Sequence, residues 1–197
     1  MSLMQAVTLL FLVMDPLGNI PFFMTAVKKV APQRRQWVIA RELLIALAIM
    51  VAFLFAGQGL LGLIQVSPEA LTAAGGIILM LIAVRMVFPS PETTLEEVSL
   101  SDEPFIVPLA VPYTAGPSLL AVEVLLVSQD PGRWPVWLAA VLMAWAASAA
   151  ILFLSGYLER ILGERVLLAI ERLMGMVLVM ISTQMVFDGI QRFFDMG

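Results

Sequence analysis

Long apolar runs separated by short polar segments make up the chain from end to end. The runs cover about residues 1–27, 37–64, 70–88, 105–128, 134–158 and 169–190. Each is roughly as long as the ~20 residues that an α-helix needs to cross a hydrocarbon core about 30 Å thick. The runs are apolar on every face and lack a two-residue alternation, which favours helices over a β-barrel. The pattern predicts an all-α integral membrane protein with six transmembrane helices.

Composition narrows the function classes. The chain is 61% hydrophobic and 13% charged with a mean hydropathy of +0.98, whereas soluble domains carry about 25% charged residues. These values exclude a soluble enzyme and a disordered protein, and the net charge of −4 argues against a nucleic-acid partner. Cys and His are both absent, so thiol chemistry and His-based metal or triad catalysis are excluded. We expect no enzyme, cofactor or metal. The expected partners are the lipid bilayer and a small-molecule substrate, and the sequence leaves the oligomeric state open.

The distribution of Lys and Arg predicts the orientation. If the runs alternate across the membrane, nine of the eleven basic residues fall on one side. These nine are Lys28, Lys29, Arg34, Arg35, Arg41, Arg85, Arg160, Arg165 and Arg172, and the other two are Arg133 and Arg192. The positive-inside rule places the nine in the cytoplasm and both termini in the periplasm. The first run has no basic residue before it, so we interpret it as a retained span rather than a signal peptide.

The chain contains an internal repeat. Residues 76–88 and 175–187 are identical at six of thirteen positions, at an offset of 99. A pair of prolines recurs at an offset of 96, as Pro16 with Pro21 and Pro112 with Pro117. We therefore predict one membrane domain over residues 1–197, with repeat one at about 1–89, an acidic linker at about 89–104 and repeat two at about 105–197. Three spans in each copy would give the copies opposite orientations, an inverted repeat of the kind found in many secondary transporters.

Both repeats interrupt their first helix near its middle. The sequences are Asp15-Pro-Leu-Gly-Asn-Ile-Pro21 and Pro108-Leu-Ala-Val-Pro-Tyr-Thr-Ala-Gly-Pro117. Proline removes a backbone donor and clashes with the preceding turn, so neither stretch continues a regular helix. The second halves would begin near Asn19 to Pro21 and near Gly116 to Ser118, and their N–H groups attract a carboxylate. The carbonyl ends of the first halves suit an ammonium, so the pair predicts a zwitterionic amino acid. Kinked helices repaired by their neighbours are the structural alternative.

Side chains at these breaks add candidate chemistry. An acidic group at membrane depth is a functional candidate, so Asp15 is expected to bind a substrate amine or a transported proton. The alternative is that Asp15 caps the segment that begins at Pro16, and the two roles are compatible. Asn19, Tyr113 and Thr114 supply further hydrogen-bonding groups.

A second acid, Glu123, lies about 9 Å along a helix from Pro117. It is a second proton-coupling candidate, and the competing interpretation pairs it with Arg85 or Arg41. Arg41 and Glu42 themselves lie near the predicted cytoplasmic end of the second span, where we expect interfacial side chains.

The two proline-rich motifs resemble those of the MarC family of bacterial inner-membrane proteins. Arg41-Glu-Leu-Leu-Ile-Ala-Leu47, Gly75-Gly-Ile-Ile-Leu79, Glu103-Pro-Phe-Ile-Val-Pro108 and Glu171-Arg-Leu-Met-Gly175 are similar to its YhgN-like branch. The resemblance covers nearly the whole chain and implies six spans. Related SnatA-type proteins transport small neutral amino acids such as alanine and glycine. The resemblance thus implies a site lined by Asp15, Pro16, Gly18, Asn19 and Pro21, faced by Pro112, Thr114, Gly116 and Pro117.

The leading hypothesis is a secondary transporter of small neutral amino acids, in the exporting direction. Its site would lie at the membrane midplane between the half-helix ends, with Tyr113 and Ser118 included, and Asp15 or Glu123 as candidates for proton coupling. The alternatives are a non-transporting membrane protein that binds lipid or scaffolds a complex, and broader efflux of drugs or metabolites.

Overall fold

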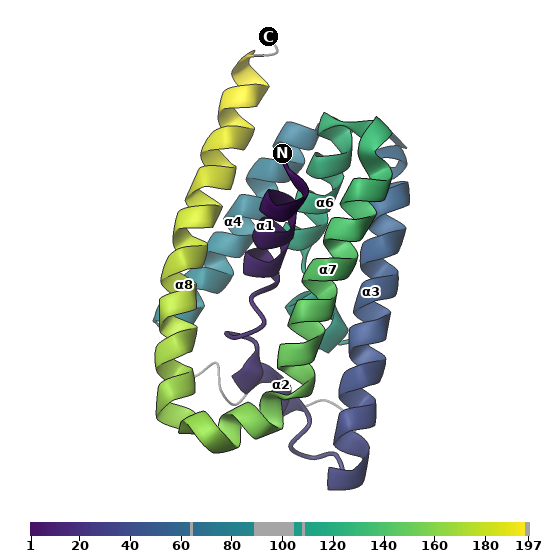
Figure 1. Cartoon of the computed structure of the whole chain (residues 1–197). Helices are drawn as coiled ribbons and strands as arrows, with labels where there is room; N and C mark the ends of the chain where they lie inside the picture. Colours follow the sequence, from purple (N-terminus) through teal and green to yellow (C-terminus); the bar gives the residue numbers. More distant parts are fainter. Residues whose placement is uncertain (64, 89–104, 108, 196–197) are drawn as a thin grey trace.

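The computed structural model describes residues 1–197 except 64, 89–104, 108 and 196–197. Within these residues the chain is almost wholly helical and contains no β-strand, which confirms the all-α prediction (Figure 1). The acidic linker predicted at 89–104 and Pro108 lie outside the described residues.

The first half of the chain forms the helices α1 (Leu3–Met14), α2 (Ile20–Ala26), α3 (Pro32–Leu63) and α4 (Pro68–Val87). Helix α1 starts in a capping box, in which Ser2 Oγ accepts the Gln5 N–H and Gln5 Oε1 accepts the Ser2 N–H. Helix α4 starts with Ser67 Oγ accepting the Ala70 N–H, and a proline occupies its first position.

The second half forms η1 (Leu109–Thr114), a short π-helical turn, followed by α6 (Pro117–Gln129) and the 3₁₀ turn η2 (Pro131–Arg133). The helices α7 (Trp134–Phe153) and α8 (Ser155–Asp195) complete the fold. Helix α8 is interrupted at Gly163, whose φ of +74° divides it into residues 155–162 and 164–195.

The predicted end of the fifth span at residue 158 is wrong. Helix α7 stops at Phe153, and the N–H groups of Tyr157 and Leu158 both donate to the Leu154 carbonyl in the first turn of α8. The apolar pattern continues through this corner, because side chains on both sides of it are hydrophobic. The turn therefore leaves no sign in hydropathy alone.

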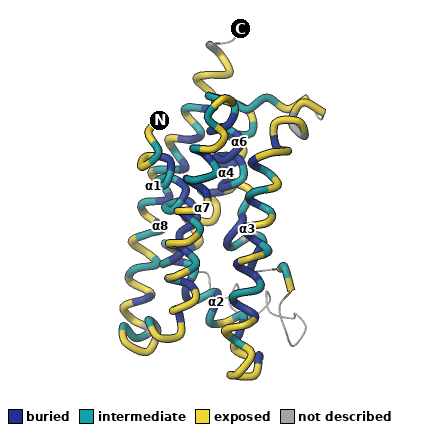
Figure 2. Tube along the Cα trace, turned by 45° about the vertical axis from the view of Figure 1, so that its right-hand side comes forward, coloured by how far each residue is buried: buried dark blue, intermediate teal, exposed yellow. Residues whose placement is uncertain are grey.

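Four helices in the described part of the chain are long and apolar enough to cross a membrane. They cover Pro32–Gly59, Pro68–Val87, Pro131–Phe153 and Arg165–Phe194, and the shorter apolar helices cover Leu3–Met14 and Pro117–Ser128. Large apolar residues are exposed, among them Leu81, Met180 and Phe187. Figure 2 shows exposed and partly exposed positions along most of the long helices. A hydrocarbon environment satisfies such a surface, whereas water does not.

The helices run side by side along one long axis (Figure 1). Helices α1 and α2 together lead from the end that holds both termini to the opposite end, from which α3 returns. Helix α4 descends again, η1 and α6 ascend, α7 descends and α8 ascends to the C-terminus. The α2–α3 and α7–α8 connections thus both lie at the end away from the termini (Figure 1). We call it the arginine-rich end because these connections and the helix starts beside them carry Lys28 to Arg35 and Arg160.

Helices α4 and α8 cross closely in an antiparallel pair, with glycines at the contact. A Cβ built on Gly76 would lie 2.9 Å from the Ser182 carbonyl oxygen and 3.0 Å from the Met185 Cβ. A Cβ built on Gly175 would lie 3.1 Å from the Ala83 carbonyl oxygen and 3.0 Å from the Met86 Cβ. Only the absence of side chains at Gly76 and Gly175 lets the two backbones approach this closely.

Candidate functional site

Two helix breaks face each other inside the helical bundle, and prolines set the limits of each. Asp15 precedes Pro16 and adopts the left-handed conformation at φ 43°, ψ 59°, while Val111 precedes Pro112 and is extended at φ −130°, ψ 128°. The residue before a proline avoids the α-helical region, which explains why α1 stops at Asp15 and why Val111 departs from helical geometry inside η1. The next helices carry Pro21 and Pro117 in their first turn, where a missing N–H costs nothing.

Asp15 is buried, with 4% of its surface exposed, at the C-terminal end of α1. Its Oδ1 accepts the Gly18 N–H at 3.2 Å, which confirms the capping interpretation of this residue. A Cβ added to Gly18 would collide with the Asp15 carboxylate and with the Met86 terminal methyl of α4. The carboxylate of Glu171 on α8 is close enough to act electrostatically on Asp15. This end of the first break is therefore acidic and tightly enclosed.

Asn19 joins the two breaks. Its Nδ2 donates to the Met14 carbonyl at the end of α1 and to the Tyr113 carbonyl in η1, both at 2.9 Å. The Tyr113 ring stacks on the Phe22 ring, with centroids 4.9 Å apart. The amide of Asn19 thus supplies hydrogen bonds to the protein itself at this depth, and the pairing across 94 residues of chain fixes how the breaks meet.

Hydroxyl groups at the second break donate hydrogen bonds to backbone carbonyls. Thr114 Oγ1 donates to the Leu109 carbonyl at 2.9 Å, and Ser118 Oγ donates to the Gly75 carbonyl of α4 at 2.8 Å. Gly116 is the extended residue before α6, and its helix start has no side-chain cap. The first N–H groups of a helix lack intrahelical partners, so the start of α6 is a suitable place for a negatively charged group.

Glu123 lies in the middle of α6 and is completely buried. Neither of its carboxyl oxygens has a hydrogen-bond partner within the described residues. The alternative in which Glu123 pairs with Arg85 or Arg41 is therefore wrong. Arg41 instead pairs with Glu42, its neighbour in the chain, with the Arg41 Nη2 2.8 Å from the Glu42 Oε1.

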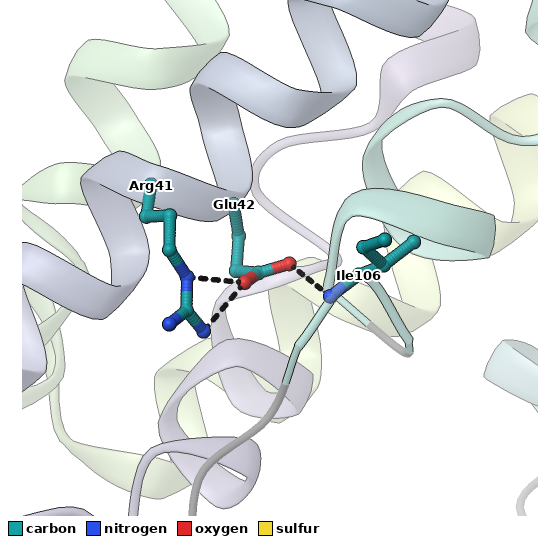
Figure 3. Close-up of polar contacts among 3 residues, drawn as sticks. All are labelled: Arg41, Glu42 and Ile106. Carbon is teal, nitrogen blue, oxygen red and sulfur yellow. Dashed lines mark hydrogen bonds and ion pairs between the residues drawn. The ribbon is translucent and has the colours of Figure 1, made fainter.

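Sequence reasoning missed a polar cluster formed by Arg41, Glu42 and Ile106 (Figure 3). We expected Arg41 and Glu42 at the membrane interface, but the Glu42 side chain is completely buried. Its Oε2 accepts the Ile106 N–H at 2.8 Å, at the start of the segment that leads into η1. The sequence signal that we missed is the opposite charges of the adjacent Arg41 and Glu42, which precede a long uncharged stretch of the helix. A carboxylate that is paired in this way can be buried.

Two shallow hollows among the described residues are lined by residues other than those of the breaks. One is lined by Arg165, Leu168, Ala169 and Arg172 of α8. The other lies between α4 and the C-terminal part of α8 and is bordered by Glu69, Ala73, Gly189 and Phe193. The described residues contain no group of three His, Cys, Asp or Glu side chains arranged to hold a metal ion.

Comparison with known proteins places the chain in a family. Residues 1–194 match the model of the MarC family integral membrane proteins. The chain is 47% identical to the UPF0056 inner membrane protein YhgN of Escherichia coli K12, over 96% of each chain. It is 46% identical to a UPF0056 membrane protein of Buchnera aphidicola subsp. Schizaphis graminum, over 98% of both chains. It is 34% identical to a UPF0056 membrane protein of Chlamydia muridarum, over 100% of this chain and 96% of the relative. No solved structure matches the chain. The chain belongs to the MarC family of integral membrane proteins.

Proposed function

We propose that the protein is a secondary transporter of small neutral amino acids such as alanine and glycine, working as an exporter. The observation that carries the proposal is the meeting of two helix breaks, joined by the hydrogen bond from Asn19 to the Tyr113 carbonyl. Interrupted helices that face each other inside a membrane protein are the usual framework of a transporter's substrate site.

The substrate's chemistry follows from the groups at the two breaks. The Asp15 carboxylate, with Glu171 nearby, provides a pole for an ammonium group. The start of α6 at Gly116 and Pro117 provides the opposite pole for a carboxylate. The space is confined, because a single methyl group at Gly18 would collide with Asp15 and Met86. A zwitterion with a small side chain is the ligand class that fits these features.

The packing of α4 against α8 supports an inverted repeat. At the offset of 99, Gly76 corresponds to Gly175, while Ala83 and Met86 correspond to Ser182 and Met185. Gly76 lies against Ser182 and Met185, and Gly175 lies against Ala83 and Met86 in the same way. Such reciprocity is what a two-fold axis between the two helices produces. We therefore propose six crossings in one membrane domain, with repeats at about residues 1–89 and 105–197.

The site in this proposal is formed by the residues at the two breaks. They are Asp15, Pro16, Gly18, Asn19 and Pro21 from the first break, and Pro112, Tyr113, Thr114, Gly116, Pro117 and Ser118 from the second. The arginine-rich end would face the cytoplasm of the inner membrane, with both termini in the periplasm.

Glu123 is the group best suited to carry a proton in this proposal. It is fully buried and has no hydrogen-bond partner among the residues that the structure describes, and a lone buried carboxylate is too costly to remain ionised. The helices that pack against α6 carry charged residues only toward their ends. These are Arg34, Arg35, Arg41 and Glu42 on α3, Glu69 and Arg85 on α4, and Arg133 on η2, while α1 and α7 have none. Glu123 could release its proton only if water reached its carboxyl group. Proton release would therefore require a change in conformation. Asp15 is the second proton-coupling candidate.

The test is counterflow of labelled alanine and glycine in proteoliposomes, with wild type beside Asp15→Asn and Gly116→Leu. Saturable exchange that both substitutions remove is the expected result. Absence of exchange by well-folded protein, across a panel of small neutral amino acids, would contradict the proposal. It would instead favour a lipid-binding or scaffolding protein, or efflux of another substrate class.

A further inference from the structure

Glu42 uses one carboxylate oxygen to hold a distant part of the chain and the other to pair with its neighbour Arg41. Its Oε1 accepts from the Arg41 Nε at 3.0 Å and the Nη2 at 2.8 Å, and its Oε2 accepts the Ile106 N–H at 2.8 Å (Figure 3). The Arg41 guanidinium also lies 5.1 Å from the ring centres of both Trp37 and Phe105. Helix α3 is thereby fastened to the segment that enters the second break.

The backbone held by Glu42 is strained. Ile106 has a φ of +63°, a region that β-branched residues rarely adopt. The chain makes a three-residue turn there, with the Val107 N–H donating to the Phe105 carbonyl at 2.7 Å. A charged acceptor makes a stronger hydrogen bond than a neutral one, so the Glu42 contact helps to maintain this conformation.

The same turn leads to the proposed substrate site. The Ile106 carbonyl accepts the Val111 N–H at 2.9 Å, which starts the helical turn η1. The Tyr113 carbonyl in η1 accepts the amide of Asn19. A short sequence of hydrogen bonds therefore connects Glu42 on α3 to the meeting point of the two breaks.

The corresponding place in the other repeat has no such contact. At the offset of 99, Arg41 and Glu42 correspond to Ala140 and Val141 of α7, and at the offset of 96 Ile106 corresponds to Leu10 of α1. Ala140, Val141 and Leu10 are all completely buried in one apolar cluster. The fold thus joins helix to broken helix by a charge-assisted hydrogen bond from the Ile106 N–H to Glu42 at one of two corresponding places, and by apolar packing at the other.

We propose that Arg41 and Glu42 form a polar lock that closes the substrate path at the arginine-rich end by holding η1 against α3. The inference rests on the proposed transport function. In an inverted repeat, the path opens to one side by separating one of the two equivalent contacts. A charge-assisted lock at one contact alone biases the protein against opening at that end. Both residues act on the site through Ile106, so they are positioning residues.

The experiment uses the absence of Cys from the chain. Ala110 lies in η1, one turn after Ile106, and is completely buried. The reporter substitution Ala110→Cys introduces a single thiol there, and its labelling by a membrane-impermeant maleimide is measured in separate samples from each side of sealed vesicles. The test variant adds the double substitution Arg41→Ala with Glu42→Val, which copies the Ala140–Val141 pair and leaves no unpaired buried charge. A second reporter, Ala144→Cys in the buried part of α7, detects general loosening of the fold.

The expected result is that the double variant labels the thiol at position 110 about tenfold faster from the arginine-rich side alone, with labelling at position 144 unchanged. Unchanged labelling at position 110 would overturn the lock, as would faster labelling from both sides or faster labelling at position 144. If the double variant does not fold, Glu42→Gln replaces it, with a smaller increase expected on the same side. The failure of the transport proposal is distinguishable, because it would remove alanine counterflow from the wild type whatever the labelling shows.

Discussion

The two helix breaks begin at equivalent residues, Asp15 and Val111, and each ends in a helix with a proline in its first turn. Their polar groups differ. The first break contains a buried carboxylate and an amide that reaches the other break. The second contains hydroxyls that donate to nearby carbonyls. The two breaks have prolines at matching positions of the sequence, whereas their backbone conformations and polar groups differ.

This difference separates the scaffold from the site. The glycine contacts between α4 and α8 repeat closely, because they determine how two backbones approach each other. The charged groups at the breaks and the lock at Glu42 occur only once within the described residues. A reciprocal glycine contact combined with unequal polar groups at the breaks suits the proposed transporter, which must hold one ligand in one orientation and distinguish two sides of a membrane. The following predictions test this comparison.

The largest effect is expected at the carboxylate of the first break. Asp15→Asn should reduce alanine exchange by about 100-fold, because the substrate amine loses its charged partner. The comparison substitution at the second break, Ser118→Ala, should reduce exchange by less than about threefold, because it removes a neutral hydrogen bond to the Gly75 carbonyl. Counterflow measured for both variants checks the difference, and equal losses would show that the two breaks contribute alike.

The amide that joins the breaks should have the next largest effect. Asn19→Ala removes two hydrogen bonds and leaves the Tyr113 carbonyl without its amide donor. We expect a loss of roughly 1–3 kcal/mol in the free energy of unfolding and about a tenfold decrease in exchange. Gln58→Ala is the control, because its exposed amide makes a 3.3 Å contact with Ser128. A decrease of the same size in Gln58→Ala would contradict a special role for the bridge.

The position of the breaks could be predicted from the sequence, whereas the hydrogen bonds that hold them in place could not. Proline and the residue before it restrict the local backbone, so a short proline-rich motif is enough to locate a break. The bond from Asn19 to Tyr113 depends on tertiary packing across 94 residues. The burial of Glu42 was unpredictable for a similar reason, because its acceptor role depends on the Ile106 N–H, far away in the chain.

The two glycines at the contact between α4 and α8 should contribute equally to stability. Gly76→Ala and Gly175→Ala should each lower the free energy of unfolding by about 1–3 kcal/mol, since the new methyl groups meet the backbone of the partner helix. Gly59→Ala in α3 should instead raise it by about 0.5–1 kcal/mol, because the described residues of other elements leave the space around the new methyl group open and alanine favours the helix. Thermal unfolding in detergent measures all three. A clear loss in one glycine variant with none in the other would argue against the two-fold contact.

The smallest effect on exchange is expected at Glu123, where the repeats again differ. Its counterpart at the offset of 96 is Val27, which is equally buried and apolar. Glutamine is close in shape to a protonated glutamate, so Glu123→Gln should fold and exchange alanine within about twofold of wild type. Because glutamine cannot release a proton, accumulation driven by a pH gradient should disappear. Val27→Ala, which changes the counterpart without touching a proton carrier, should retain the accumulation. If Glu123→Gln still accumulates alanine in response to the gradient, the proton is carried elsewhere, and Asp15 becomes the remaining acid among the described residues that lies at a break.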